Sequence, residues 1–348
     1  MAQGPLEIGT FNAIGQRKPF FAVQGALRDY LEFHGRHTRL PVAYSDLRRY
    51  DGLMPLLDAK GKETLWNSVM YRPHEVESLH EQLVQTYQLL IADGRRIDHL
   101  RVASIDFCAY GNSQPFRIKI LNQINDNHDY YYIKRNDASR VYGLELEHLL
   151  SPNRISYMCH EDTLVEEHII GVPGDTFMED PSRYGGHLNP VRLSKEFVKF
   201  NERCFVRLLG DMRAYNFVVD VIHDLDQVQY RLRSIDFDQQ CYEGRARIYL
   251  PQFYKENLPY VQFAQDVISL ETADQYRGEE RSLLRKRFRL TKERLEPLLE
   301  AMLTDTISTP EKTKELAAEL AEHHKDPAIR MSKSMGEVLV RHLDILLG

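Results

Sequence analysis

Two nearby stretches of the chain read Gly210-Asp211-Met212-Arg213-Ala214-Tyr215-Asn216-Phe217-Val218-Val219 and Ser234-Ile235-Asp236-Phe237-Asp238. The first stretch has an acid, a base two positions later, and an amide five positions after the acid. The second stretch places another acid at the end of a β-prone run. Because a helical pattern precedes the first stretch, we predict a polar loop between a helix and a β-hairpin.

These residue types suit one kind of chemistry. A carboxylate can take the proton of an acceptor hydroxyl, and a cation can neutralise a phosphate. An amide and a second carboxylate offer the hard oxygen ligands that Mg²⁺ prefers. The order of the four groups therefore predicts metal-assisted phosphoryl transfer.

The composition is that of an ordinary globular protein. The 348 residues are 43% hydrophobic and 28% charged, and the formal net charge is −6, which is compatible with a sizeable core. The mild acidity argues against a nucleic-acid-binding protein, whose affinity depends on neutralising phosphates. No apolar run of about 18 residues indicates a membrane span.

The termini and cysteines favour the cytoplasm. The N-terminal residues 1–5 lack the basic and apolar regions of a signal peptide. The four cysteines are widely spaced and form no Cys-x-x-Cys pair, which argues against a zinc site. We therefore expect reduced, buried thiols and a cytoplasmic location.

The first 97 residues are expected to form a largely helical N-terminal extension. Residues 73–93 carry apolar side chains at helical spacing. Pro73 suits the first turn of this helix, and Gly94 suits the position past its end.

Residues 98–170 change to a strand pattern. We expect strands at residues 101–110, 116–124, 130–135, 154–159 and 163–169, with a helix at 138–150 between the third and the fourth strand. The segment 171–175 contains two glycines and a proline and is predicted to be a hinge. Residues 171–348 are predicted to be mostly helical apart from the hairpin at 217–235.

This order of elements, with the Asp/Arg/Asn loop after a hinge, resembles the protein-kinase-like superfamily. The similarity is to its atypical branch, which includes the aminoglycoside phosphotransferases, and it covers roughly residues 98–300. It implies an α+β fold with two lobes: a five-stranded antiparallel N-lobe at 98–170 and a helical C-lobe at 171–348.

The resemblance also implies roles for the residues of the Asp/Arg/Asn loop and of the segment 234–238. Asp211 matches the catalytic-loop acid, and Arg213 matches the cation that stabilises the transferred phosphoryl group. Asn216 and Asp236 match the two metal ligands. Asp238 departs from the usual Asp-Phe-Gly pattern and could be a further ligand or a loop residue. The alternative for each is a turn or surface residue without a catalytic role.

Two further site positions, a lysine and its glutamate partner, each have two candidates. The superfamily keeps a lysine on the third strand for the α- and β-phosphates, and Lys134 matches it better than Lys119. Its usual partner is a glutamate on the next helix, where Glu145 and Glu147 are both available. We prefer Glu145, which shares a helical face with apolar residues.

The nucleotide would also contact two backbone segments. The turn that contains Asn112 and Ser113 would cover the phosphates, although it has only one glycine where the family has several. The segment from Glu167 to Ile169 would offer backbone groups to the adenine.

The resulting hypothesis is an ATP- and Mg²⁺-dependent phosphotransferase. It would move the γ-phosphoryl group to a hydroxyl of an unknown acceptor, either a small molecule or a protein. The single-glycine turn favours an alternative, a catalytically degenerate kinase-like protein that binds nucleotide or acts as a scaffold. A third hypothesis is a helical interaction protein in which the Asp/Arg/Asn pattern is accidental.

Overall fold

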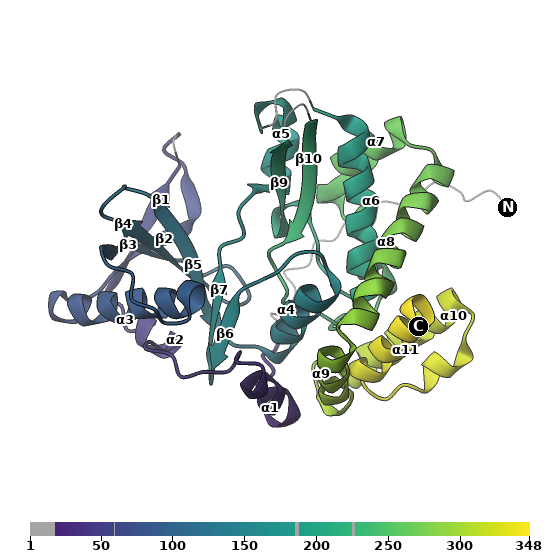
Figure 1. Cartoon of the computed structure of the whole chain (residues 1–348), viewed down its shortest axis with the longest axis horizontal. Helices are drawn as coiled ribbons and strands as arrows, with labels where there is room; N and C mark the ends of the chain where they lie inside the picture. Colours follow the sequence, from purple (N-terminus) through teal and green to yellow (C-terminus); the bar gives the residue numbers. More distant parts are fainter. Residues whose placement is uncertain (1–17, 59, 185–187, 225–226) are drawn as a thin grey trace.

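The computed structural model describes residues 18–58, 60–184, 188–224 and 227–348. Two antiparallel sheets and a largely helical C-terminal half make up this part of the chain (Figure 1). The strands are β1 (Gly52–Leu57), β2 (Glu63–Met70), β3 (Leu100–Phe107), β4 (Phe116–Asn122), β5 (His128–Arg135), β6 (Tyr157–His160), β7 (Thr163–Glu167), β8 (Val172–Pro173), β9 (Phe217–Asp224) and β10 (Gln227–Ser234). The α+β class is therefore confirmed.

The larger sheet has seven strands in the order β1-β2-β3-β4-β5-β7-β6. The prediction of a five-stranded sheet is therefore wrong. The five expected strands are present as β3 to β7. The hairpin of β1 and β2 extends the sheet, since Asn67 pairs with Phe107 on β3. The expectation of a largely helical extension is thus wrong for residues 52–70, where Pro55 and several leucines and methionines gave no clear strand signal.

The helices are α1 (Gly25–Phe33), α2 (Tyr44–Leu47), α3 (Pro73–Ala92), α4 (Ala138–Leu150), α5 (Gly174–Glu179), α6 (Pro190–Arg207), α7 (Leu258–Val267), α8 (Leu270–Leu290), α9 (Lys292–Thr304), α10 (Pro310–His324) and α11 (Met335–Leu347). Helix α3 begins at Pro73 as predicted, and it is capped at its C-terminal end by Asp93, which adopts a left-handed conformation with φ of 51°. The predicted hinge forms β8 and the start of α5 instead of an open linker.

One face of the larger sheet is covered by α2 and α3. Alternate residues of the central strands point into this smaller core, including Ile118 on β4 and Tyr131 and Ile133 on β5, all fully buried. Residues of α2 and α3, such as Leu47 and Leu83, fill the same core. The residues between them on the strands therefore lie on the opposite face of the sheet.

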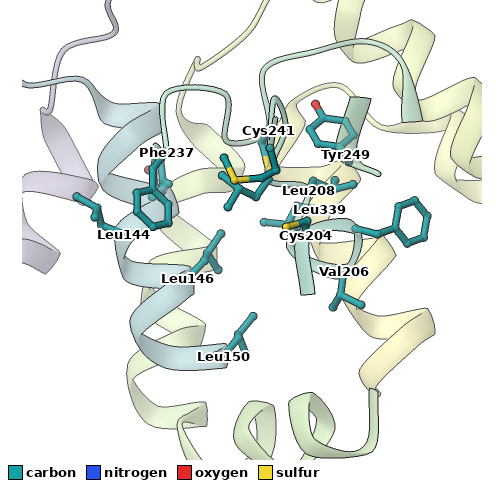
Figure 2. Close-up of a cluster of buried hydrophobic side chains, with 14 of the residues drawn as sticks. Leu144, Leu146, Leu150, Cys204, Val206, Leu208, Phe237, Cys241, Tyr249 and Leu339 are labelled. Atoms are coloured by element: carbon teal, nitrogen blue, oxygen red, sulfur yellow. The ribbon is translucent and has the colours of Figure 1, made fainter. Parts of the chain in front are cut away.

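Helix α4 covers only one end of that opposite face and belongs to the larger core. Twelve of its thirteen residues are buried, and it packs with Leu164 of β7 and with the helices of the C-terminal half. Figure 2 shows Leu144 of α4 beside Phe237, which follows Asp236 in the chain. This packing fixes the loop after β10 against α4.

All four cysteines are buried and have free thiols, as expected from their spacing. Within the described ranges, no helix combines the length and the hydropathy that a membrane crossing requires.

Candidate functional site

The loop that carries Asp211 is built by the end of α6. Helix α6 is capped at its C-terminal end by Leu208, which adopts a left-handed conformation with φ of 52°. The amide of Gly210 donates a hydrogen bond to the Gln239 carbonyl at 3.2 Å. Asp211 itself has φ of 58°, a conformation that non-glycine residues adopt rarely and often at functional sites.

The structure brings Asp211, Arg213 and Asn216 together. Arg213 Nε donates to Asp211 Oδ1 at 2.7 Å, and Asn216 Nδ2 donates to the Asp211 carbonyl at 2.7 Å. Arg213 also donates to Glu256 at 3.0 Å, and the amide of Asp211 donates to the Tyr254 hydroxyl at 3.1 Å. The loop is therefore held in place by hydrogen bonds between its own residues and by hydrogen bonds to Tyr254 and Glu256.

Burial and neighbouring charges set the ionisation of Asp211. Burial raises the pKa of its carboxyl group, Arg213 opposes this rise, and the charge of Asp236 adds to it. For Arg213, burial works against the charged form, but the hydrogen bond and charge of Asp211 keep its pKa above the ordinary value. Asp211 is thus a carboxylate with a raised pKa beside a permanent cation.

Asp236 lies beside this loop. The amide of Ile235 donates to the Asn216 carbonyl at 3.0 Å. Asp236 Oδ1 accepts hydrogen bonds from Arg140 Nη1 at 2.8 Å and from the amide of Asp238 at 3.0 Å. Burial and the neighbouring Asp238 raise the pKa of Asp236.

Asp238 is more deeply placed than Asp236. Its side chain is 6% exposed and accepts a hydrogen bond from Arg140 Nη1 at 2.7 Å, whereas the side chain of Asp236 is 36% exposed. Burial alone would raise the pKa of Asp238, but Arg140 and then Lys18 hold it below its ordinary value. Asp238 therefore acts as a buried ion-pair partner, and Asp236 is the more accessible carboxylate.

Lys134 does not pair with the glutamate expected from the resemblance. Its Nζ donates to Glu166 Oε2 on β7 at 2.7 Å, so the expected Lys134–Glu145 pair is wrong. Burial and then the charge of Arg140 lower the pKa of Lys134, and Glu166 opposes this effect. Burial would raise the pKa of Glu166, but Arg140 and Lys134 hold it at about 2.

The two glutamates of α4 serve other parts of the fold. Glu145 accepts hydrogen bonds from the hydroxyls of Tyr30 and Tyr157, each at 2.7 Å, and from Arg294 at 2.8 Å. Glu147 pairs with the buried Arg207 of α6. Both carboxylates therefore face the C-terminal half or α1 and not Lys134.

Arg140 is the site residue that the sequence prediction missed. Its side chain is 1% exposed and binds Glu166, Asp236 and Asp238 together. It thereby connects Lys134, through Glu166, to Asp236. Its position in the first turn of α4, three residues after the capping Asp137, was the only available signal, because its partners are 26 to 98 residues away.

The predicted phosphate turn lies at the end of β5. The Ser113 carbonyl accepts a hydrogen bond from the amide of Arg135 at 3.3 Å, and Ser113 is buried. Asn112 is half-buried. The turn therefore lies at the same end of the sheet as Lys134.

The segment predicted to contact the adenine offers less than expected. The amide of Glu167 already donates to the Ser156 carbonyl at 3.0 Å. The Ile169 side chain is 9% exposed and belongs to the larger core. Lys119, the alternative to Lys134, lies on the open sheet face with its Nζ 5.8 Å from the centre of the Tyr130 ring.

The donor set of Asn216 and Asp236 fits a hard cation. In the described part of the chain the hydrogen bonds to Asp236 reach Oδ1, which leaves Oδ2 for a ligand. Asn216 uses Nδ2 as a donor, so its oxygen is the remaining polar atom. Mg²⁺ needs only one or two such protein ligands because it keeps several waters. Among the described residues, those of this site included, no group of three or more His, Cys, Asp or Glu could hold a metal ion.

Two cavities lie away from these residues. One of about 420 Å³ lies between α3 and β3, and one of about 370 Å³ lies between α3, β6 and residues 35–38. Neither is lined by a predicted site residue.

The sequence matches no protein-family model, and no relative is found among curated proteins.

Proposed function

We propose that the protein is an ATP- and Mg²⁺-dependent phosphotransferase with the two-lobed architecture of the kinase-like superfamily. The observation that carries this proposal is the position of Asp236 beside the Asp211–Asn216 loop, with Arg140 connecting Asp236 to Glu166 and Lys134. Acid, cation and metal-ligand groups that are far apart in the sequence thus meet at one site.

In the proposed reaction Asp211 accepts the proton of the acceptor hydroxyl. The acceptor oxygen bonds to the γ-phosphorus while the bond between the γ-phosphorus and the bridging β-phosphate oxygen breaks, which releases ADP. Arg213 stabilises the phosphoryl oxygens, and Lys134 binds the α- and β-phosphates. Asn216 and Asp236 would hold Mg²⁺, which neutralises phosphate charge when bound. We place the reaction in the cytoplasm, where free thiols stay reduced.

The test uses the substitution Asp211→Asn, which keeps the size of the side chain. Calorimetric binding of ATP with Mg²⁺ should be retained, whereas release or transfer of the γ-phosphoryl group should fall by about 10²- to 10⁴-fold. An Asp211→Asn variant as active as the wild type would remove Asp211 from the mechanism.

A second candidate function is a kinase-like nucleotide-binding protein without catalysis. It is favoured by Arg140, whose guanidinium occupies Asp236 Oδ1, and by the turn with a single glycine. Wild-type protein that binds ATP with Mg²⁺ but transfers no phosphoryl group to water or to any of a panel of hydroxyl acceptors would support this candidate.

A further inference from the structure

The open face of the larger sheet carries a set of alternating aromatic and cationic side chains. We call it the aromatic–cation patch, and it consists of Trp66, Arg117, Lys119, Tyr130, Tyr132 and His168. All six side chains are half-buried. They lie between the core residues in sequence, so they point away from α2 and α3.

The patch is a connected layer of rings and charges. The Arg117 guanidinium lies 4.4 Å from the Trp66 ring centre and 5.4 Å from that of Tyr130. The rings of Trp66 and Tyr132 are 6.3 Å apart, and those of Tyr132 and His168 are 5.8 Å apart. Asp106 forms an ion pair with Arg117 at 2.8 Å and leaves Lys119 as an additional positive charge.

The patch continues directly into the proposed phosphate site. Lys134 Nζ lies 5.3 Å from the centre of the Tyr132 ring, on the same face of β5. From Lys134 the ion pairs run through Glu166 and Arg140 to Asp236. A planar ligand on the patch would therefore have its anionic tail beside Lys134.

The charge and shape of the patch select its occupant. Aromatic rings and guanidinium groups bind planar π-systems by stacking, and this contact tolerates different bases because each base has a π-face. Recognition of a base edge by the amide of Glu167 conflicts with its hydrogen bond to the Ser156 carbonyl. A nucleoside triphosphate satisfies both the rings and the cations.

We propose that the aromatic–cation patch holds the base of the nucleotide by stacking, so that the site binds purine triphosphates without selecting adenine over guanine. The inference rests on the proposed phosphotransferase function and adds to it the mode of base recognition. Trp66 is the only tryptophan of the chain, so its fluorescence reports directly on this patch.

The test combines calorimetry and tryptophan fluorescence in the presence of Mg²⁺. ATP and GTP should quench Trp66 and bind within about threefold of each other, whereas tripolyphosphate should bind without comparable quenching. Tyr132→Leu should weaken both nucleotides by about tenfold to hundredfold and leave tripolyphosphate unchanged. The control Tyr276→Leu removes a half-buried tyrosine of α8 that also has a lysine over its ring, and it should change neither affinity.

The contrary outcomes separate this inference from the function on which it rests. If wild-type protein binds neither nucleotide nor tripolyphosphate, the phosphotransferase proposal fails and the inference fails with it. If ATP binds without quenching Trp66 and Tyr132→Leu binds normally, only the patch is wrong. ATP binding more than tenfold tighter than GTP would show base-edge recognition. Equal quenching by a single-stranded oligonucleotide in the wild type and in Asp236→Ala would assign the patch to nucleic acid instead.

Discussion

At the scale of single residues, Arg140 determines the electrostatics of the site. It is a buried cation shared by Glu166, Asp236 and Asp238. Arg140→Met keeps much of the side-chain volume but leaves these carboxylates with only Lys134 and the more distant Lys18 as neighbouring cations. Because an uncompensated buried charge is costly, we expect a loss of about 3–5 kcal/mol in the free energy of unfolding at pH 7, measured by urea denaturation.

This loss should depend on pH with a definite sign. Arg140 and Lys134 hold the pKa of Glu166 at about 2, below its unfolded value of about 4.3. The stabilisation is therefore complete above that unfolded value and falls as the pH falls towards the folded value. The difference between Arg140→Met and the wild type should shrink on acidification. If the difference in free energy of unfolding between the two proteins stays constant from pH 7 to pH 3, Arg140 does not stabilise the fold through the charge of Glu166. The control Arg245→Met, at an exposed ion pair with Glu315, should cost about 1 kcal/mol or less.

Arg213 should determine the pH below which the enzyme loses activity, which is the acidic side of the pH dependence of kcat/KM. Asp211 must be ionised to accept a proton, and Arg213 opposes the rise of its pKa caused by burial. In Arg213→Ala this opposition is lost, so the pKa of Asp211 rises further and activity appears at higher pH. The pH dependence of kcat/KM measures this shift. An acid limb that does not move, or that moves to lower pH, would exclude Asp211 as the base.

At the scale of elements, periodicity was enough where the pattern is local. Helix α3, the five strands from β3 to β7 and the β9–β10 hairpin lie close to their predicted positions because each has its own alternation and end signals. The β1–β2 hairpin was missed because none of its strand residues is fully buried and the strands show no clear alternation. Its place in the sheet depends on the distant pairing of Asn67 with Phe107.

The contact between α9 and α11 offers a test of helix packing. Gly336 lies in the first turn of α11, and a Cβ there would collide with the Met302 carbonyl of α9. Since a backbone carbonyl cannot move without moving its helix, Gly336→Ala should lower the free energy of unfolding by about 1–3 kcal/mol. Gly278→Ala is the matched control, because its Cβ would meet nothing within 4 Å in α8, and it should stabilise by about 0.5–1 kcal/mol. Chemical denaturation measures the change in the free energy of unfolding for both variants. Changes of the same sign in the two variants would contradict the close packing of Gly336 on α9.

At the scale of the whole molecule, Glu145 joins segments that are far apart in the sequence. Tyr30 of α1, Tyr157 of β6 and Arg294 of α9 all bind this one fully buried carboxylate of α4. Burial would raise its pKa, but Arg294 and Arg36 hold it below the ordinary value. The N-terminal segment and the C-terminal half are therefore connected through α4.

Glu145→Gln should loosen these segments together. The amide cannot match the charge of Arg294, so the amides of α1, α4 and α9 should all exchange hydrogen faster than in the wild type. Exchange in β1 and β2, which do not contact Glu145, should not change. Faster exchange confined to α4 would show that Glu145 does not connect the other two helices.

The candidate site could be predicted only in part. Asp211, Arg213 and Asn216 are close in the sequence, and a hairpin returns the chain to Asp236, so local spacing was sufficient to predict their proximity. The partner of Lys134 was predicted wrongly, since both candidates, Glu145 and Glu147, lie on α4, whereas Glu166 lies on β7. Only the strand register places Glu166 beside Lys134.

The most direct test is a thermal-shift titration with ATP and Mg²⁺ on the wild type, on Asp236→Ala and on the control Asp266→Ala, which alters an exposed acid of α7. A nucleotide site beside Asp236 predicts a saturable rise in Tm that follows RT ln(1 + [L]/Kd) in the wild type and the control, and that disappears in Asp236→Ala. No rise in the wild type, or an equal rise in all three proteins, would contradict a metal–nucleotide site at Asp236.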